Sequence, residues 1–289
     1  MAPRQLGLVV HPRRHIDDSL QTIRDWASGH GVAVGQVVIP GQSRHVAEPI
    51  EVDACDLVLS LGGDGTTLAA LHASAPASRP VLGVACGSIG VLTSVAADDV
   101  AWALERVAQG RWSARAIPGL EVSAETGELW VAINDFTVIR DGTGQVITGI
   151  SVDDELYART AGDGVVVATP LGSSAYTMAA GGPILAPGVE GMVVTALAHH
   201  GGVAPSLVVG PDSRLELTVE PGYGGGRLEV DGQVLSSAAT TLTVTMRREY
   251  ATLVALAGEE PMLTGLRRRG LIVDGPRIVV RERRDASER

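Results

Sequence analysis

The first hundred residues alternate short apolar runs with segments of helical spacing, and this alternation limits the folds that the chain can adopt. Runs at Leu6–Val10, Asp56–Leu61 and Val81–Ala85 are typical of buried strands. Residues 20–27 and 100–107 carry apolar side chains on one helical face. Because strands separated by helices form parallel sheets with covered faces, this part of the chain predicts an α/β domain.

The pattern changes near Arg115. From there the chain consists of short β-branched segments separated by Gly, Asp and Pro, and we expect residues 129–139 to form one such strand. This pattern is typical of a β-rich domain. We therefore expect an α/β domain with a parallel sheet at residues 1–114 and a β-rich domain at residues 115–258.

Residues 259–289 carry much charge and form a third part of the chain. We expect a helix at Glu259–Arg269 and a strand at Leu271–Val280 that pack back on the first domain. The charged end, Arg281–Arg289, is expected to fray, because terminal residues without apolar anchors are poorly ordered.

The composition excludes several function classes. The chain has no lysine: all 23 basic residues are arginine, set against 33 acidic residues, for a net charge of −10. An acidic chain is a poor general binder of nucleic acid, which needs a basic face. The absence of lysine excludes a Walker A loop, Schiff-base chemistry and a lysine base. An active site here must use arginine, carboxylates, backbone amides or a metal.

The sequence indicates a cytoplasmic protein. Cys55 and Cys86 lack metal-ligand spacing and form no disulfide framework, which fits a reducing compartment, although both thiols can equally be small core side chains. The N-terminus has no apolar run of the kind that a secretion signal needs. No uncharged apolar stretch is long enough to span a membrane.

A glycine-rich segment follows the strand expected at Asp56–Leu61. Gly62, Gly63 and Gly65 surround Asp64, and Thr66 continues into a helical pattern. Glycines let a ligand approach the backbone, and amides at a helix start bind phosphate. A single carboxylate among them suits a metal partner or a base that accepts a hydroxyl proton. The alternative is a strand-to-helix turn with a capping Asp.

A second dense element, Thr169–Tyr176, follows the strand at Gly164–Ala168. Hydroxyl groups and backbone amides gather around Gly172. Tyr176 offers a flat apolar face for an adenine or nicotinamide ring, together with a hydroxyl group. The alternative is a helix start with serine caps and a core tyrosine.

A polar pair interrupts the expected strand at residues 129–139. Asn134 and Asp135 are costly to bury unless they are paired, and the Asn side chain can contact an adenine edge or a ribose. A bulge or a sheet-edge pair is the alternative. The Asp-Gly pairs at residues 163–164 and 231–232 are each typical of a hairpin turn.

Two further pairs invite functional interpretations. His199 and His200 are adjacent, so on a strand they point to opposite faces and do not easily bind one metal. Arg13 and Arg14 follow the first strand, where strand ends in α/β sheets face a binding crevice. They either approach a phosphate donor or form a solvated pair.

Five motifs occur in a specific order. They are GGDGT at Gly62–Thr66, ND at Asn134–Asp135, DGVVVATPLGSSAY at Asp163–Tyr176, AGGP at Ala180–Pro183 and VDGQ at Val230–Gln233. GGDGT alone is shared with diacylglycerol and sphingosine kinases. In this order and spacing, the five together resemble the ATP- or polyphosphate-dependent NAD kinases, over roughly Leu6 to Leu266.

The resemblance implies both an architecture and a reaction. NAD kinases have an N-terminal α/β domain and a β-rich C-terminal domain that binds NAD, with the active site between them. They phosphorylate the 2′-hydroxyl of the adenosine ribose of NAD to give NADP. The expected donor is ATP or polyphosphate with Mg²⁺ or another divalent cation, and the expected assembly is a homodimer or homotetramer.

The resemblance also assigns residues. It makes Asp64 the catalytic proton acceptor, places Asn134 and Asp135 on the adenosine portion, and places Asp163 near the nicotinamide end; no residue is assigned to a metal. The residues expected to bind substrate or nucleotide are Gly62, Gly63, Gly65, Thr66, Asn134, Asp135, Asp163, Leu171, Gly172, Ser173, Ser174, Ala175, Tyr176 and Gln233.

Several positions depart from the family pattern. Asp135 replaces the usual Glu, Leu171 a Thr, Ala85 an Asn, and Ala161 a frequent Arg. Fewer cations near the substrate put its identity in question. The alternatives are a different acceptor, such as NADH or another adenosine compound, or a nucleotide-binding paralogue without catalysis.

Overall fold

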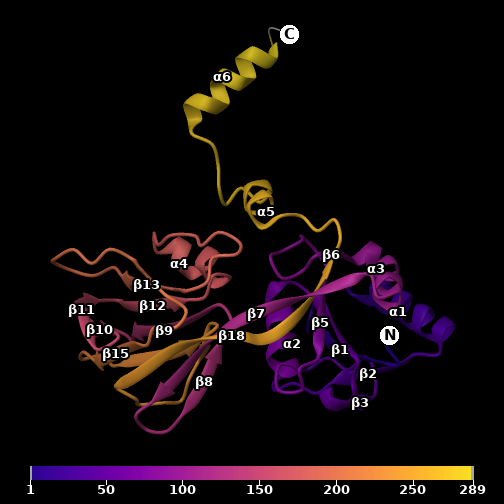
Figure 1. Cartoon of the computed structure of the whole chain (residues 1–289), viewed down its shortest axis with the longest axis horizontal. Coiled ribbons are helices and arrows are strands. Elements are labelled where there is room, and N and C mark those ends of the chain that lie inside the picture. Colours follow the sequence, from indigo (N-terminus) through magenta and orange to yellow (C-terminus); the bar gives the residue numbers. More distant parts are fainter. Residues whose placement is uncertain (1, 288–289) are drawn as a thin grey trace. The chain divides into compact units, whose positions relative to one another are not determined.

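The chain divides into two compact units. The computed structural model describes residues 2–287, and Figure 1 labels its elements where there is room. The first unit combines the chain up to Ala70 with Val81–Ser113 and the residues from Val254 onward. The second unit combines Leu71–Pro80 with Ala114–Leu253. Each is described by itself below.

The first unit is built on a parallel sheet, as the alternating sequence pattern predicts. Its strand order is β5-β4-β1-β2-β3, and the short β6 pairs with β5. Every one of these pairings is parallel. The strands are β1 (Gln5–Val10), β2 (Ala33–Val37), β3 (Pro49–Ile50), β4 (Leu57–Gly62), β5 (Pro80–Ala85) and β6 (Val95–Ala96).

Three helices accompany this sheet: α1 (Asp17–His30), α2 (Asp64–Ser74) and α3 (Val100–Ala108), with short helices η1 (Val52–Ala54) and η2 (Ala97–Asp99) between strands. The apolar faces of α1 and α3 pack against alternate residues of β1 and β4 in one core. Leu20 of α1 and Leu104 of α3 are among the buried side chains. Helix α1 ends at Gly31, whose φ of 65° is a left-handed conformation that glycine adopts readily.

The second unit contains antiparallel strands in two layers. One layer has the order β11-β10-β15-β18 with β7 and β8, and the other has the order β14-β13-β12-β9-β16-β17. Side chains of both layers, among them Phe136 and Leu217, form one core. The strands are β7 (Trp112–Ala124), β8 (Leu129–Ala132), β9 (Asp135–Arg140), β10 (Val146–Val152), β11 (Glu155–Gly162), β12 (Gly164–Ala168), β13 (Met192–Leu197), β14 (Leu207–Val209), β15 (Leu215–Glu220), β16 (Gly226–Val230), β17 (Gln233–Val234) and β18 (Thr241–Leu256).

The expectation of one strand at residues 129–139 is wrong. The segment forms β8 and β9, which pair with different neighbours. The break occurs because the backbone amides of Ile133 and Asn134 donate to the carboxylate of Asp231, at 2.9 and 2.6 Å, and not to a strand partner. The polar pair therefore stands at the start of β9.

The two Asp-Gly pairs differ in structure. Asp231 and Gly232 have φ of 50° and 76° and join the antiparallel strands β16 and β17, so this pair is a two-residue hairpin turn. Asp163 and Gly164 instead join β11 in one layer to β12 in the other. Gly164 has φ of 145°, and a side chain there would overlap the carbonyl of Val138.

The C-terminal part is helical. It forms α5 (Met262–Arg268) and α6 (Pro276–Ser287), so the expected strand at Leu271–Val280 is wrong. Its β-branched residues favoured a strand, but proline at the first helical position and the charged run of good helix formers after it favour a helix. Of the expected frayed tail, residues 281–287 belong to α6, and residues 288 and 289 lie outside the described part. No helix in the described chain is long and apolar enough to cross a membrane.

Candidate functional site

The glycine-rich segment forms the turn from β4 into α2. Gly62 is the last residue of β4, and a side chain there would overlap the hydroxyl of Thr66. The amides of Thr66 and Thr67 donate to the carbonyl of Gly63, at 2.9 and 3.0 Å, and close the first turn of the helix. Gly62 and Thr66 thus shape the turn, while Gly63 and Gly65 present their backbones to the pocket described below.

Asp64, the first residue of α2, is held by the loop that follows β5. Its Oδ2 accepts a hydrogen bond from the Val91 amide at 2.9 Å, and its Oδ1 accepts from the Leu92 amide at 2.9 Å and the Thr93 amide at 3.3 Å. A side chain at Gly90 would overlap the carboxylate. Because these bonds join Asp64 to a separate loop, the interpretation of this residue as a capping Asp is not supported.

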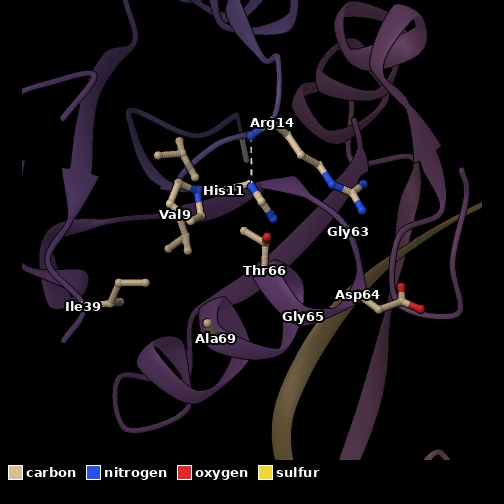
Figure 2. Close-up of a pocket in the computed structure, with 11 residues that line it drawn as sticks. Val9, His11, Arg14, Ile39, Gly63, Asp64, Gly65, Thr66 and Ala69 are labelled. Atoms are coloured by element: carbon tan, nitrogen blue, oxygen red, sulfur yellow. Dashed lines mark hydrogen bonds between the residues drawn. The ribbon is translucent and has the colours of Figure 1, made fainter. Parts of the chain in front are cut away.

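A pocket of about 350 Å³ lies at the glycine-rich turn (Figure 2). Figure 2 shows apolar side chains, including Val9, Ile39 and Ala69, at one end. Arg14 and Asp64 lie toward the other end, with His11 and Thr66 between. The pocket is lined by Val9, Val10, His11, Pro12, Arg14, Ile39, Gly63, Asp64, Gly65, Thr66 and Ala69. This volume and mixture of apolar and polar groups are typical of small-molecule sites.

Arg14 lies against the glycine-rich turn. Its Nη1 donates to the carbonyl of Cys86 at 3.2 Å. A side chain at Gly63 would come 3.3 Å from this nitrogen, and one at Gly87 would come 2.8 Å from it. Of the pair considered from the sequence, Arg14 therefore provides a fixed cation at the turn, whereas Arg13 does not line the pocket. The guanidinium of an arginine can donate to two phosphate oxygens at once.

His11 lines the same pocket, and sequence analysis missed it. Its Nδ1 accepts hydrogen bonds from the amides of Arg13 and Arg14, at 3.1 and 3.0 Å. Burial lowers the pKa of His11, and the charges of Arg14, Arg13 and Arg44 lower it further. The ring is therefore neutral near pH 7 with its proton assigned to Nε2, which makes it a hydrogen-bond donor. The signal was the histidine two and three residues before paired arginines.

In the second unit, the Thr169–Tyr176 segment packs against the start of β9. The Thr169 hydroxyl donates to the carbonyl of Ile133 at 2.6 Å, and its amide donates to the carbonyl of Asn134 at 2.9 Å. A side chain at Gly172 would overlap the carbonyl of Asn134. The structure therefore brings together two of the motifs that the sequence singled out.

The hydroxyl groups of this segment have local partners. Ser173 is buried; its hydroxyl donates to the carbonyl of Pro170 at 2.6 Å and accepts from the amide of Leu185 at 2.9 Å. The Ser174 hydroxyl donates to the carbonyl of Leu171 at 3.1 Å. Both side chains therefore stabilise the segment itself, which leaves its backbone and Tyr176 as the groups most open to a ligand.

Tyr176 is 40% exposed, so the alternative of a core tyrosine is wrong. It lies at the start of the short helix α4 (Tyr176–Ala179), after η3 (Gly172–Ser174) and the exposed Ala175. Burial raises the pKa of its hydroxyl, and the nearby charges of Glu229, Asp163 and Asp135 raise it further. Tyr176, Asp135 and Asp163, all predicted to contact the nucleotide, therefore lie close enough for the two carboxylates to affect the tyrosine hydroxyl.

Asp135 is the most perturbed acid near Tyr176. It is 7% exposed, and its burial, followed by the charges of Asp231 and Glu229, raises its pKa to about 7. A carboxyl group with such a pKa changes its charge near neutral pH. Perturbed acids of this kind gather at functional sites.

Two other predicted residues lie in the second unit. Asp163 accepts a hydrogen bond from Nε of Arg140 at 2.5 Å, so this carboxylate has a cationic partner. Gln233 is exposed and begins β17, directly after the Asp231–Gly232 turn. The structure therefore leaves the Gln233 side chain available for contact.

The side chains that could bind a metal do not cluster in the described part of the chain. His199 and His200 follow β13 in an irregular segment, and no group of three His, Cys, Asp or Glu suited to a metal occurs in the described chain. Asp64 is the one carboxylate lining the pocket among the described residues. Mg²⁺ commonly binds through one or two carboxylates together with substrate phosphates. The pocket therefore fits an ion that arrives with a triphosphate rather than one held by the protein alone.

The chain matches two known domain families. Residues 6–112 match the ATP-NAD kinase N-terminal domain, and residues 133–257 match the ATP-NAD kinase C-terminal domain. The NAD kinase of Chlorobium phaeobacteroides is 31% identical, over 88% of this chain and 92% of its own length. The NAD kinase of Haloarcula marismortui is 36% identical, over 74% of this chain and 75% of its own length.

Solved structures share the fold. Yeast NADH kinase complexed with NADH superposes with a TM-score of 0.77 at 21% identity, over 92% of this chain and 87% of that one. An NAD kinase from Archaeoglobus fulgidus in complex with ATP gives 0.73 at 21% identity, over 92% and 97%. The expected combination of a parallel α/β sheet and an antiparallel β-rich part is confirmed.

The fold and the glycine-rich carboxylate site define a nucleotide-dependent phosphotransferase. The domain matches and the relatives make the class specific. The chain belongs to the NAD kinase family.

Proposed function

We propose that this protein transfers the γ-phosphoryl group of ATP to the 2′-hydroxyl of the adenosine ribose of NAD, giving NADP. The observation that carries the proposal is Asp64, which stands at the start of α2 beside a pocket that also contains Arg14. Phosphoryl transfer depends mainly on positioning and on neutralising charge on the phosphate oxygens. The amides at the helix start and the arginine neutralise phosphate charge, and the carboxylate positions the hydroxyl group.

Each group has a distinct part in the reaction. The amides of Gly63 and Gly65 and the guanidinium of Arg14 bind donor phosphates, and His11 donates a hydrogen bond from Nε2. The ribose O2′ forms a bond to the γ-phosphorus while the bond from that phosphorus to the β–γ bridging oxygen breaks. Asp64 accepts the hydroxyl proton, and ADP leaves with the bridging electron pair.

Asp64 retains the capacity for this proton. A carboxylate oxygen offers two acceptor positions, and among the described contacts Oδ2 uses one of them, for the Val91 amide. The remaining position can orient the hydroxyl. The three hydrogen bonds from backbone amides fix the carboxylate before substrate arrives. This lowers the free-energy cost of reaching the reactive geometry.

The residues of the second unit bind the acceptor. Asn134 and Asp135 contact adenosine, the backbone from Leu171 to Ala175 and the Tyr176 ring hold the nucleotide, and Gln233 adds a further contact. Glycine at position 172 allows the segment to lie against Asn134, which supports a shared role for the two motifs.

A second acceptor, NADH, is favoured by the Arg140–Asp163 pair. The family resemblance places Asp163 near the nicotinamide end, and NAD carries a cationic ring there whereas NADH does not. Arg140 at 2.5 Å offsets the charge of Asp163. A neutralised carboxylate attracts the oxidised ring less, so phosphorylation of both NAD and NADH fits this arrangement.

Further parts of the proposal concern the cation, the assembly and the compartment. Mg²⁺ bound to the donor phosphates would supply charge neutralisation that no lysine can provide in this chain. We further propose a homodimer or homotetramer, on the family resemblance, and a cytoplasmic location, to which Cys55 and Cys86 are suited as thiols outside any disulfide.

A direct assay tests the function. Purified protein is incubated with Mg²⁺, with NAD or NADH as acceptor and with ATP or polyphosphate as donor, and formation of NADP or NADPH is followed with a coupled dehydrogenase. We expect turnover with ATP. Tight NAD binding without consumption of any donor would show a non-catalytic nucleotide-binding protein.

The apolar end of the pocket predicts a preference for a nucleoside triphosphate. Ile39 is half-buried there and can cover the base of ATP, which polyphosphate lacks. Shortening this side chain removes about 1 kcal/mol of apolar contact, so Ile39→Ala should raise the KM for ATP about fivefold.

The KM for tripolyphosphate should not change in Ile39→Ala. Val38→Ala is the matched control, since Val38 is 63% exposed and does not line the pocket. Equal effects of Ile39→Ala on both donors would contradict the placement of the base.

A further inference from the structure

The geometry points to Asp231 as a positioning residue that sets the Asn134–Asp135 pair for the acceptor, with His72 holding Asp231 in place. This inference rests on the proposed function, because it assigns a role in binding the acceptor nucleotide. It concerns the second unit alone, to which all four residues belong.

The carboxylate of Asp231 accepts three consecutive backbone amides. Its Oδ2 accepts from the Ile133 amide at 2.9 Å, and its Oδ1 accepts from the amides of Asn134 at 2.6 Å and Asp135 at 3.2 Å. The side chain is 4% exposed. At the point where β8 ends and β9 begins, this carboxylate therefore does what a neighbouring strand would do: it satisfies and orients the backbone.

A reciprocal bond closes the arrangement. The backbone amide of Asp231 donates to the carbonyl of Asp135 at 2.9 Å. Main chain and side chain of one residue thus bind the same short segment from two directions. The φ of 50° at Asp231 and of 76° at Gly232 makes the tight turn that permits this.

His72 fixes the carboxylate from its other side. Its Nε2 lies 2.6 Å from Oδ2 of Asp231, and its Nδ1 lies 3.1 Å from the hydroxyl of Tyr250. Because a carboxylate oxygen accepts, Nε2 is the donor, so the buried charge receives four hydrogen bonds from three amides and one imidazole. A buried carboxylate with this many donors is held firmly. Removing one donor leaves a buried acceptor without a partner, which destabilises the arrangement.

The consequence is specific to the acceptor. The carboxylate controls where the backbone of Asn134 and Asp135 stands and therefore where their side chains meet adenosine. It does not line the donor pocket. A change at Asp231 should weaken acceptor binding while leaving the donor KM unchanged, and this separation distinguishes positioning from a general loss of structure.

Asp231→Asn is the first test. The variant keeps the shape and one acceptor oxygen but turns an NH₂ group toward backbone N–H donors. We expect the KM for NAD to rise about tenfold, kcat to stay within about threefold and the KM for ATP to stay within about twofold. Thermal unfolding of each variant is recorded in parallel, so that a partly unfolded variant is recognised.

His72 provides the second test. His72→Leu removes the donor and should raise the KM for NAD about fivefold, whereas His72→Gln restores a side-chain donor and should recover most of that loss. His30→Leu is the matched control: His30 ends α1 and lies 3.4 Å from the half-exposed Glu105, so its loss should change neither KM.

The outcomes separate the inference from the proposed function. Absence of NADP and NADPH formation by the wild-type protein refutes the function. With an active wild type, an unchanged KM for NAD in Asp231→Asn, or equal increases for NAD and ATP, overturns the positioning role. If Asp231→Asn fails to fold, the His72→Leu and His72→Gln pair decides: equal NAD affinity in both also overturns it.

Discussion

Asp64→Asn should lower the turnover of NAD phosphorylation by at least about 10²–10⁴-fold, the usual contribution of a general base. The asparagine amide cannot accept the ribose proton at neutral pH, so the 2′-hydroxyl would attack without assistance. Binding of NAD should persist, because the acceptor contacts proposed above come from other residues. Turnover by coupled NADP formation and NAD affinity by calorimetry are the two measurements.

The hydrogen bonds of Asp64 add a second effect to this variant. Asparagine would turn an NH₂ group toward the amides of Val91, Leu92 or Thr93, which now donate to the carboxylate. The loop after β5 should therefore loosen, and the melting temperature should fall slightly. Gly90→Ala tests the same contact from the loop, since its methyl group would displace the intact carboxylate and should also reduce kcat.

Near-wild-type turnover in Asp64→Asn would remove the base from the mechanism. Gly29→Ala serves as the control for the Gly90 variant, because a methyl group at position 29 of α1 meets open space. If Gly90→Ala left kcat unchanged, the position of the Asp64 carboxylate would not limit the reaction.

Asp135→Asn should stabilise the folded protein above pH 7. The pKa of Asp135 rises from 3.8 to about 7, so the folded state holds this proton more tightly than the unfolded chain does. Wild-type stability therefore falls as the pH rises from about 4 to about 7, and it levels off above that range. At about 1.4 kcal/mol per pKa unit, the loss reaches about 4 kcal/mol, as an order of magnitude.

Asparagine removes this loss, because it carries no charge to bury. The free energy of unfolding, measured in urea at pH 5 and pH 8, should fall less between these values in the variant than in the wild type. Asp98→Asn, at an exposed position, is the control and should leave the pH dependence unchanged. A wild-type and a variant protein with the same pH dependence would show that Asp135 ionises normally.

Much of the fold follows from periodicity. The parallel strands β1, β4 and β5 and the helices α1 and α3 were predictable. Buried strands give unbroken apolar runs, and the apolar residues of covering helices recur every three to four positions. The two-residue strands β3 and β6 are too short to give such a run. The two misplaced elements have local causes. The β-branched residues of α6 suggested a strand. The apolar residues on both sides of the Asn134–Asp135 pair hid the end of β8.

The parts of the site that come from neighbouring residues in the sequence could be predicted. The parts that depend on contacts between residues far apart in the sequence could not. Asp64 and its glycines stand together in the sequence, and so does the segment at Thr169–Tyr176. The Asp231 carboxylate meets the amides of residues 133–135 from almost a hundred positions away. The paired arginines that follow His11 were the one local signal for this residue, and its role depends on the folding of the turn that contains them.

The guanidinium of Arg14 at the glycine-rich turn has a consequence for chemistry in solution. Arginine stays protonated at every pH at which a protein remains folded, and acylating or Schiff-base reagents that consume primary amines do not react with it. The positive charge at this turn is therefore insensitive to lysine acetylation, a modification that has no target side chain in this sequence.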